Sequence, residues 1–278
     1  MVLLHSNQET PGASGIKLIR SVLICHHDEP LNQFGLARWL ASFTDLAAVV
    51  VIREPSGRLR QRIRRELRRV GFLRFLDVLA FRLYYRFALA NADRAWTEAT
   101  LQQLLRSYPE LPPSCRILET PSPNSAEVLQ LLRDVQPALI LARCKTILKE
   151  QIFSTASVGT FVMHPGVCPE YRNAHGCFWA LAHRDLGKVG MTLLRVDAGV
   201  DTGPLYGYYG CDFDEKRESH IVIQNRVVFD NLGRLRKDLE NILSNPSQTI
   251  DTTGRKSQTW GQPWLTAYWR WKRAARRA

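Results

Sequence analysis

The sequence predicts an α/β protein whose core is a doubly wound, mostly parallel sheet. Two runs of consecutive apolar residues, IRSVLIC (19–25) and DLAAVVVI (45–52), are typical of strands that are buried on both faces. A segment with apolar residues at helical spacing, NQFGLARWLASF (32–43), lies between them. Strand, helix and strand within about 35 residues form the opening unit of a parallel sheet with covered faces.

The alternation of strands and helices continues to residue 164. We expect strands at CRIL (115–118), ALILA (138–142) and VGTFVMH (158–164). Asn124 or Ser125 is the expected cap of a helix over 126–135, which Pro137 ends, and a short helix is expected over 148–153. A strand over 189–196, a tight glycine-rich loop and one long amphipathic helix over 215–243 are expected to follow.

Two segments stand outside this alternation. Residues 57–106 have apolar side chains at helical spacing and form a predicted helical insertion, which could cap the sheet, contact a partner or touch a membrane surface. The tail WGQPWLTAYWRWKRAARRA (260–278) is aromatic and basic, and its tryptophans could pack on the domain or form an interface. We therefore divide the chain into a flexible leader (1–17), an α/β domain (18–245) and a basic aromatic extension (246–278).

The positive charge is concentrated in two places. Residues 58–69 contain seven arginines and one glutamate, and residues 270–277 add five cations, in a chain whose net charge is +12. Such patches can contact nucleic acid, anionic lipid or an acidic partner, although a solvated helix face has the same pattern. No nucleic-acid-binding motif accompanies them. The arginine-rich helix at 58–69 is therefore a candidate site for an anionic partner other than nucleic acid.

Several classes of protein are disfavoured. No stretch approaches the roughly 18 uncharged apolar residues of a transmembrane helix. The six cysteines have no CxxC spacing, which is typical of reduced thiols in a cytoplasmic protein, and we expect no metal site. The loop after the first strand, CHHDEP (25–30), lacks the GxGxxG glycines of a dinucleotide site. Its histidines could bind an anionic acceptor or simply end the strand in solvent.

Candidate catalytic side chains follow the strand at 158–164. Ligands bind at the carboxyl ends of strands in an open α/β sheet, and His164 is the last residue of this strand. Asp201 lies in the loop after the later strand, between Gly199 and Gly203, which let backbone approach a ligand closely. A histidine can take a proton from an amine, and a carboxylate can orient and stabilise the imidazolium. His164 and Asp201 are thus a candidate proton-transfer pair, although this spacing also fits two unrelated residues.

The segment from 159 to 205 resembles the core of the folate-dependent formyltransferase family. That family includes glycinamide ribonucleotide, methionyl-tRNA and sugar-amine formyltransferases and formyltetrahydrofolate hydrolase, and its pattern is roughly N-x-H-P-S-L-L-P-x-Y-R-G, then W-A, G-x-T and D-x-G-x-D-T-G. The residues that match are His164, Pro165, Pro169, Tyr171, Arg172, Trp179, Ala180, Gly190, Thr192, Asp197, Gly199, Asp201, Thr202 and Gly203. The resemblance is specific over about 140–210 and vaguer from residue 18 onward.

The resemblance implies a sheet of formyltransferase type and transfer of a formyl group from 10-formyltetrahydrofolate to a primary amine of a small acceptor. His164 and Asp201 match the catalytic histidine and aspartate of the family. The segment ARCKTILKEQIF (142–153) resembles the part of the family that lines the folate pocket. The residues implied to bind folate are Arg143, Ile147, Leu148, Asp197 and Gly199.

Val162 departs from the pattern, because it stands where the family has an asparagine. That asparagine donates a hydrogen bond to the oxyanion of the reaction, and loss of such a donor costs about 10²–10³ in rate. Asn173 or His175, from the adjacent loop, could supply the missing donor. Alternatively, the scaffold could serve another one-carbon or acyl reaction, or it could have lost catalysis and kept binding.

The sequence therefore predicts an N-formyltransferase that acts on a small amine, sugar-linked or nucleotide-linked. The alternatives are a catalytically impaired binding or scaffold protein and a hydrolase of formyltetrahydrofolate. The sequence shows neither the amino-terminal regulatory domain common in those hydrolases nor the carboxy-terminal barrel of tRNA formyltransferases. This counts against hydrolysis and against tRNA as the acceptor.

Overall fold

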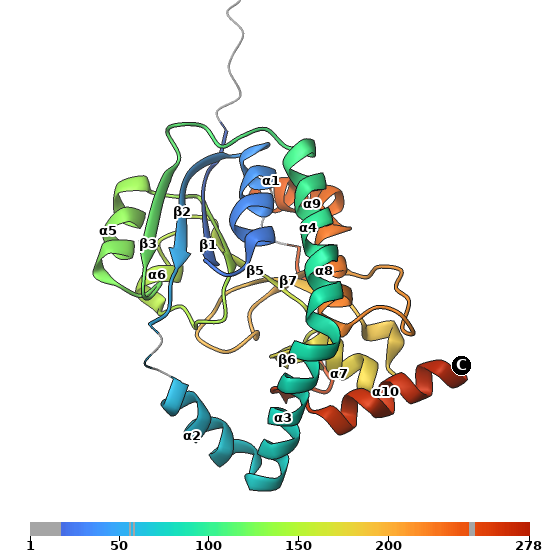
Figure 1. Cartoon of the computed structure of the whole chain (residues 1–278). Helices are drawn as coiled ribbons and strands as arrows, with labels where there is room; N and C mark the ends of the chain where they lie inside the picture. Colours follow the sequence, from blue (N-terminus) through green and yellow to red (C-terminus); the bar gives the residue numbers. More distant parts are fainter. Residues whose placement is uncertain (1–17, 56, 58, 245–247) are drawn as a thin grey trace, which may run out of the picture.

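The computed structural model describes residues 18–55, 57, 59–244 and 248–278, so the predicted leader lies outside the described residues. A seven-stranded sheet with strand order β3-β2-β1-β4-β5-β7-β8 forms its centre (Figure 1). The strands are β1 (Arg20–His26), β2 (Asp45–Ile52), β3 (Arg116–Thr120), β4 (Leu139–Arg143), β5 (Gly159–His164), β7 (Met191–Arg195) and β8 (Leu205–Tyr209). Strands β1 to β5 pair in parallel, whereas β7 and β8 are antiparallel to their neighbours.

Helices cover both faces of this sheet, which confirms the predicted α/β class (Figure 1). The helices of the first half are η1 (Leu31–Leu36), α1 (Ala37–Ala41), α2 (Leu59–Val70), α3 (Phe72–Tyr84), η3 (Tyr85–Leu89), α4 (Ala90–Ser107) and α5 (Ala126–Val135). Those of the second half are α6 (Glu150–Phe153), α7 (Gly176–Ala182), η4 (Leu186–Lys188), α8 (His220–Phe229), α9 (Leu232–Ser244) and α10 (Leu265–Arg277).

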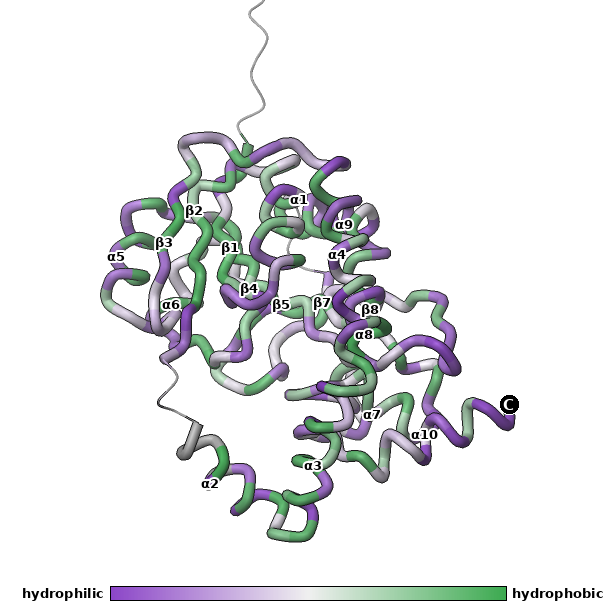
Figure 2. The backbone as a smooth tube through the Cα atoms, in the orientation of Figure 1, coloured by the Kyte–Doolittle hydropathy of each residue, from purple (hydrophilic) through white to green (hydrophobic). Residues whose placement is uncertain are grey.

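Alternate residues of the parallel strands point to opposite faces of the sheet. In β1, Leu23 and Cys25 join the larger apolar core, to which α1, α4 and α7 to α10 contribute. Val22 and Ile24 join a smaller core beneath α5 and α6. Strands buried on both faces must be apolar at every position, which explains their continuous hydrophobic runs. Figure 2 shows these apolar strands inside a more polar outer layer.

The strand order creates a crevice at one edge of the sheet. From β1 the chain moves outward to β2 and β3, and then returns to the other side of β1 to form β4 and β5. The connections after β1 and β4 therefore diverge, and the crevice at the carboxyl ends of these two strands is the usual ligand site in such sheets. Since β5 pairs with β4, its last residue, His164, lies beside this crevice.

The helices expected within 57–106 are present as α2, α3, η3 and α4. Helix α4 packs against η1, and a Cβ atom at Gly35 would lie only 2.6 Å from a methyl group of Leu104. A side chain at residue 35 would therefore push α4 away from the domain. Helices α2 and α3 project from the sheet on the side opposite to the first residues described (Figure 1).

Two expectations for the second half of the chain are wrong. No element was expected over residues 206–214, where most of strand β8 lies, and the helix expected over 215–243 is two helices, α8 and α9. Helix α8 begins after Ser219, whose hydroxyl accepts the backbone N–H groups of Ile221 and Val222. The break falls at Asp230 and Asn231, where the Asn231 amide donates to the backbone carbonyl of Val227 and so competes with helix continuation.

The tail packs against the α/β domain. A two-stranded sheet joins β6 (Arg172–Asn173) to β9 (Thr259–Trp260), and α10 lies alongside α3 and α7. Trp271 of α10 is fully buried in the larger core, whereas Trp269 is 53% exposed. The tail thus supplies core residues and also a strand that holds the loop after His164.

Candidate active site

His164 and Asp201 lie side by side, although 37 residues separate them in the chain. The Nδ1 atom of His164 is 3.4 Å from Oδ2 of Asp201, and its Nε2 atom is 2.8 Å from the backbone carbonyl of Tyr171. His164 is 4% exposed, and the Asp201 side chain is 15% exposed. Asp201 has a φ of 50°, a left-handed conformation that aspartate adopts more readily than most residues.

Both ring nitrogens of His164 face oxygen atoms that can only accept hydrogen bonds. The carbonyl of Tyr171 requires a proton on Nε2, so Nδ1 is the ring nitrogen that faces the Asp201 carboxylate. Oδ2 of Asp201 also accepts the backbone N–H of Asn173 at 2.7 Å, which fixes the carboxylate in place.

Thr192 holds the loop that follows His164. It lies opposite His164 on β7 and is fully buried. Its hydroxyl donates to the carbonyl of Gly166 at 2.7 Å and accepts the N–H of Cys168 at 3.0 Å. A Cβ atom at Gly166 would lie 2.7 Å from Nε2 of His164, so only glycine allows this close turn. The sequence marks Thr192 through the family pattern, but its bracing role depends on the β5–β7 pairing.

The two candidate replacement donors have different surroundings. The Asn173 amide donates to the backbone carbonyl of Trp260 at 2.5 Å, and its side chain is therefore engaged in holding β9. The His175 ring lies 6.0 Å from the ring of His220, and its buried Nδ1 has no hydrogen-bond partner among the described residues. Burial, with Lys145 and Arg82 nearby, lowers the pKa of His175 to about 4. A neutral imidazole is expected there near pH 7.

Val162 is half-buried on β5, two residues before His164. It lies between the strands that carry Ala142 and Leu194 and contacts the smaller apolar core. It also contacts a third apolar cluster that includes Leu194 and Cys168. The side chain is thus packed, and it contributes no donor to the site beside it.

A polar network that the sequence did not predict occupies the crevice between β1 and β4. Lys145 pairs with Glu29 at 2.7 Å, and the Asn32 amide donates to Glu29 at 2.6 Å. Arg143 donates through Nη1 to the carbonyl of Met163 at 2.5 Å and through Nε to Asn32 at 3.4 Å. The sequence pattern that could have predicted this network is that Glu29 and Asn32 follow one parallel strand and Arg143 ends another.

Charge and burial oppose each other in this network. Burial lowers the pKa of Arg143, and the nearby carboxylate of Glu29 partly offsets that effect. The pKa of Glu29 is lowered because Lys145 and Arg143 outweigh its own burial. At neutral pH the crevice therefore contains a carboxylate compensated by two cations, next to the carbonyl that precedes His164.

The remaining implied folate residues lie in two loops, one after β4 and one after β7. Ile147 is 64% exposed and Leu148 is buried in the smaller core. Asn124 clamps this loop, because its amide donates to the carbonyl of Ile147 and its oxygen accepts the N–H of Lys149. In the second loop, Oδ1 of Asp197 accepts the N–H of Gly199 and the hydroxyl of Thr202, which closes a tight turn before Asp201.

Two cavities lie close to the pair of His164 and Asp201. One, of about 230 Å³, is lined by Asp201, Arg172, Arg255 and neighbouring residues. Arg172 donates through Nη1 to the carbonyl of Val200, but its buried Nε has no partner among the described residues. This leaves one unused cationic donor beside the Asp201 carboxylate.

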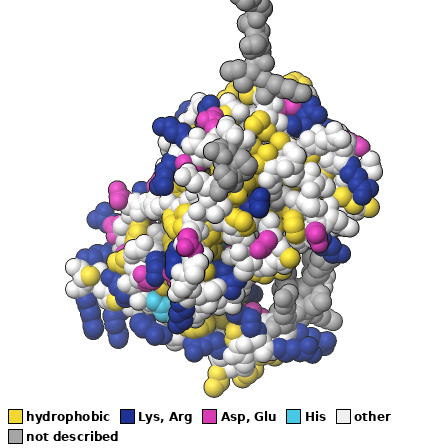
Figure 3. Space-filling view, turned by 180° about the vertical axis from the view of Figure 1, so that it is seen from behind, with side chains coloured by type: hydrophobic (Ala, Val, Ile, Leu, Met, Phe, Trp, Pro, Cys, Tyr) yellow, Lys and Arg dark blue, Asp and Glu magenta, His cyan; other side chains and the backbone are white. Residues whose placement is uncertain are grey.

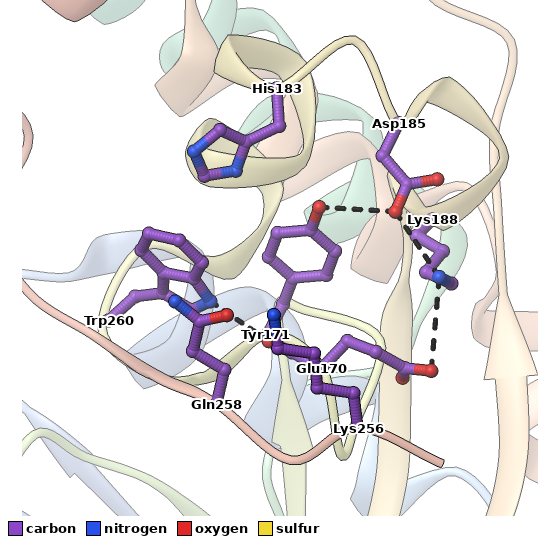
Figure 4. A pocket seen from close by; sticks show the side chains of 8 residues that line it. All are labelled: Glu170, Tyr171, His183, Asp185, Lys188, Lys256, Gln258 and Trp260. Carbon is purple, nitrogen blue, oxygen red and sulfur yellow. Dashed lines mark hydrogen bonds and ion pairs between the residues drawn. The ribbon is translucent and has the colours of Figure 1, made fainter.

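The other cavity, of about 390 Å³, is lined by Tyr171, Trp260, Asp185 and neighbouring residues (Figure 4). The ring of Trp260 stacks on that of Tyr171 with centroids 5.9 Å apart, and its indole N–H donates to the carbonyl of Glu170. The Tyr171 hydroxyl donates to Asp185 at 3.1 Å, and Lys188 lies between Asp185 and Glu170. Most polar groups of this cavity are thus already paired.

The described residues contain neither a metal-binding cluster nor a membrane-spanning helix. No group of three or more histidine, cysteine or carboxylate side chains among them could hold a metal ion. No helix among them is both long enough and apolar enough to span a membrane. The Cys168 and Cys177 thiols are buried, and burial raises the pKa of each, that of Cys177 to about 12.

Comparison with known protein families identifies the central part of the chain. The family model described as formyl transferase matches residues 97–232. The methionyl-tRNA formyltransferase of Kosmotoga olearia is 27% identical over 146 residues, which is 51% of this chain and 40% of the relative. That of Thermotoga neapolitana is 34% identical over 125 residues, which is 42% of this chain and 40% of the relative. The match thus spans about two fifths of these relatives' length.

Solved structures give the same fold over a longer range. The phosphoribosylglycinamide formyltransferase from Anaplasma phagocytophilum aligns with a TM-score of 0.52 at 14% identity, covering 89% of this chain and 100% of that chain. A sugar N-formyltransferase from Shewanella sp FDAARGOS_354 aligns with a TM-score of 0.50 at 13% identity, covering 87% of this chain and 76% of that chain. At such identities the likeness shows the fold alone. Residues 97–232 therefore match the formyltransferase family, and the chain has the fold of these solved formyltransferases.

Proposed function

We propose that the protein is an N-formyltransferase that transfers a formyl group from 10-formyltetrahydrofolate to a primary amine of a small acceptor. The observation that supports this most strongly is the pairing of His164 with Asp201 at the carboxyl end of β5. The pair lies where ligands bind in such sheets, within a loop that has the family pattern. We expect a cytoplasmic enzyme whose acceptor is linked to a sugar or a nucleotide.

The residues at this edge of the sheet suit a folate. Arg143, with Asp197 and Gly199, would hold its polar groups, and Ile147 and Leu148 would contact its ring. The observation in favour is that Ile147 is an apolar side chain held 64% exposed on a clamped loop, next to the crevice. The bound folate would supply the formyl group.

His164 and Asp201 would manage the protons of the transfer. The attacking amine must lose a proton, and the nitrogen that leaves the formyl carbon must gain one. Nδ1 of His164 faces Asp201 at 3.4 Å, the longer of its two ring contacts. We infer that this pair takes the proton of the attacking amine and gives it to the leaving nitrogen, while Nε2–H stays on the Tyr171 carbonyl and keeps the ring oriented.

Because Val162 stands in place of the family's asparagine, another group has to donate the hydrogen bond to the oxyanion if the reaction is to be fast. Asn173 could donate only after releasing the Trp260 carbonyl, to which it is now bound. The Nδ1 atom of His175 has no hydrogen-bond partner among the described residues, and neither has the Nε atom of Arg172. We infer that one of these two unpaired groups serves as the donor, with Arg172 favoured because it shares a cavity with Asp201.

A second candidate function is binding of a folate or an amine without turnover. Val162 favours this reading, because its side chain contributes no donor and is packed between apolar clusters. Both readings use the same crevice, so one set of measurements distinguishes them.

The test is release of tetrahydrofolate when the protein is mixed with 10-formyltetrahydrofolate and a panel of amino sugars, nucleotide-linked amines and aminoacyl-tRNA. His164→Ala and Asp201→Asn are each expected to lower the rate by about 10²–10⁴. Asp134→Asn, an exposed carboxylate on α5, is the matched control and should leave the rate unchanged. Folate binding without turnover in the unmodified protein would support the binding reading. Absence of folate binding would overturn the transfer reading and the folate-binding reading.

A further inference from the structure

One side of α3 and η3 carries large apolar side chains that are exposed to solvent. They recur at intervals of three or four residues and therefore form a stripe along the helix. We call them the apolar stripe; its residues are Phe72, Leu73, Leu76, Leu79, Leu83 and Phe87. Leu73 is 82% exposed and Phe87 is 77% exposed. Contiguous exposed apolar surface of this kind usually marks an interaction site.

The apolar stripe faces outward because the other side of α3 is tightly packed. Val78 and Phe81 are buried, and the Phe81 ring lies 5.3 Å from that of Tyr268 on α10. The carboxylate of Asp77 accepts hydrogen bonds from the backbone N–H and the hydroxyl of Thr266, at the start of α10. Rotating α3 to bury the stripe would break all of these contacts. The exposure is therefore fixed by the fold.

Positive charge surrounds the apolar stripe. Residues 59–89 contain nine arginines and two carboxylates, and residues 265–277 contain five cations and no carboxylate. Together these segments account for the entire net charge of +12. Arg82 and Arg86 are exposed within the stripe's own helices, and Arg270 and Arg273 are exposed on α10. Figure 3 shows lysine and arginine side chains gathered around hydrophobic ones at the lower end of the molecule.

An aromatic side chain extends this surface. Trp269 of α10 is 53% exposed, and its ring lies 6.2 Å from that of Tyr84 on α3. Two packed helices thus present leucine, phenylalanine and tryptophan together with arginine. This is the composition of helices that lie in the headgroup region of a membrane, where aromatic rings are favoured and arginine contacts lipid phosphate.

The charge decides between the candidate occupants. A second copy of the chain would bring two arginine sets together, and like charges in contact disfavour that association. An acidic protein would satisfy the charge, but it would need a pocket for each protruding side chain. A lipid bilayer with anionic headgroups accepts the protruding apolar side chains without preformed pockets and also neutralises the positive charge.

We propose that this surface binds the face of a lipid bilayer that contains anionic phospholipids. The apolar stripe and Trp269 enter the boundary between headgroups and acyl chains. The exposed arginines of the described surface contact the lipid phosphates: Arg64, Arg68, Arg82, Arg86, Arg270 and Arg273. The crevice at the carboxyl ends of β1 and β4 takes no part in this contact. The proposal is independent of formyl transfer and holds whichever acceptor the enzyme uses.

Sedimentation with vesicles tests the proposal on the full chain. The protein is expected to bind phosphatidylcholine vesicles that contain about 30% phosphatidylglycerol and not vesicles of phosphatidylcholine alone. Binding should fall at least tenfold when the salt is raised to about 0.5 M. Leu73→Asp with Phe87→Asp, and Arg82→Glu with Arg86→Glu, should each weaken binding by about tenfold or more. The matched controls, Ile117→Asp on edge strand β3 and Arg133→Glu on α5, should stay within about twofold of the unmodified protein.

A measurement on the unmodified protein tests the proposal even if the charge and stripe variants fail to fold. Brominated lipid should quench tryptophan emission, and Trp269→Phe should remove most of that quenching while the melting temperature stays the same. Three results would overturn the proposal: no binding to anionic vesicles, equal binding by all variants, or a concentration-dependent dimer that the stripe variants abolish. The last would assign the surface to a second copy of the chain.

Discussion

Replacing Thr192 by valine tests whether this residue fixes the loop after His164. Valine has nearly the same shape, so the change removes the hydroxyl and little else. The Gly166 carbonyl and the Cys168 N–H would both lose their contact with that hydroxyl in a fully buried place. A buried polar group without a partner costs about 1–3 kcal/mol, so the free energy of unfolding should fall by about 2–6 kcal/mol.

The control is Thr160→Val on the neighbouring strand β5. Thr160 is also buried, but its hydroxyl makes one hydrogen bond, to the carbonyl of Phe153 at 2.8 Å. Its replacement should cost about 1–3 kcal/mol, which is roughly half the effect at residue 192. Thr192→Ser keeps the hydroxyl and should lose only about 1 kcal/mol from the missing methyl group.

Urea unfolding at neutral pH, followed by tryptophan fluorescence, gives these free energies by linear extrapolation. Thr192→Val should lower the rate of tetrahydrofolate release as well as the stability, because it repositions the loop after His164. Thr160→Val should leave that rate unchanged. If Thr192→Val unfolds within about 0.5 kcal/mol of the unmodified protein, the bracing role assigned to the hydroxyl is wrong.

Three further predictions concern the strand before the site, a buried histidine and the tail. Val162→Asn should change the rate of tetrahydrofolate release by less than about tenfold, since Arg172 or His175 already supplies the oxyanion donor; a rise of about 10²-fold would show that neither residue does so. Burial lowers the pKa of His220 well below 6.5, so below that pH the unfolded chain binds a proton that the folded chain does not. Stability should therefore fall as the pH drops from about 6.5, by about 1.4 kcal/mol per pH unit for this residue, and urea titrations of His220→Phe should show a shallower fall. Trp260→Ala should lower the free energy of unfolding by about 3 kcal/mol, because the ring stacks on Trp179 and bonds to Glu170; the exposed Trp269 is the control, and an equal loss there would contradict the reasoning.

The sequence predicted most of the parallel half of the sheet because strands buried on both faces need apolar residues at every position. Helix α5 was predicted with its cap, since Ser125 was one of the two capping residues proposed and its hydroxyl accepts the N–H of Val128. The same reasoning missed β8, because LYGYY between loops is too short and too polar to be distinguished from a turn. It also merged α8 and α9, because the break depends on side-chain hydrogen bonds of Asn231.

What the sequence determined by itself is local: which segments form strands and helices, that His164 ends a strand, and that the family pattern surrounds it. Tertiary structure alone decided that Asp201 meets His164, because β7 runs antiparallel to β5 and ends beside the start of β5, so the loop after β7 must fold back to bring Asp201 to His164. It also decided that Asn173 holds the tail and that Trp271 belongs to the core. Side-chain partners from distant segments depend on strand order and helix packing, which hydrophobic periodicity does not encode.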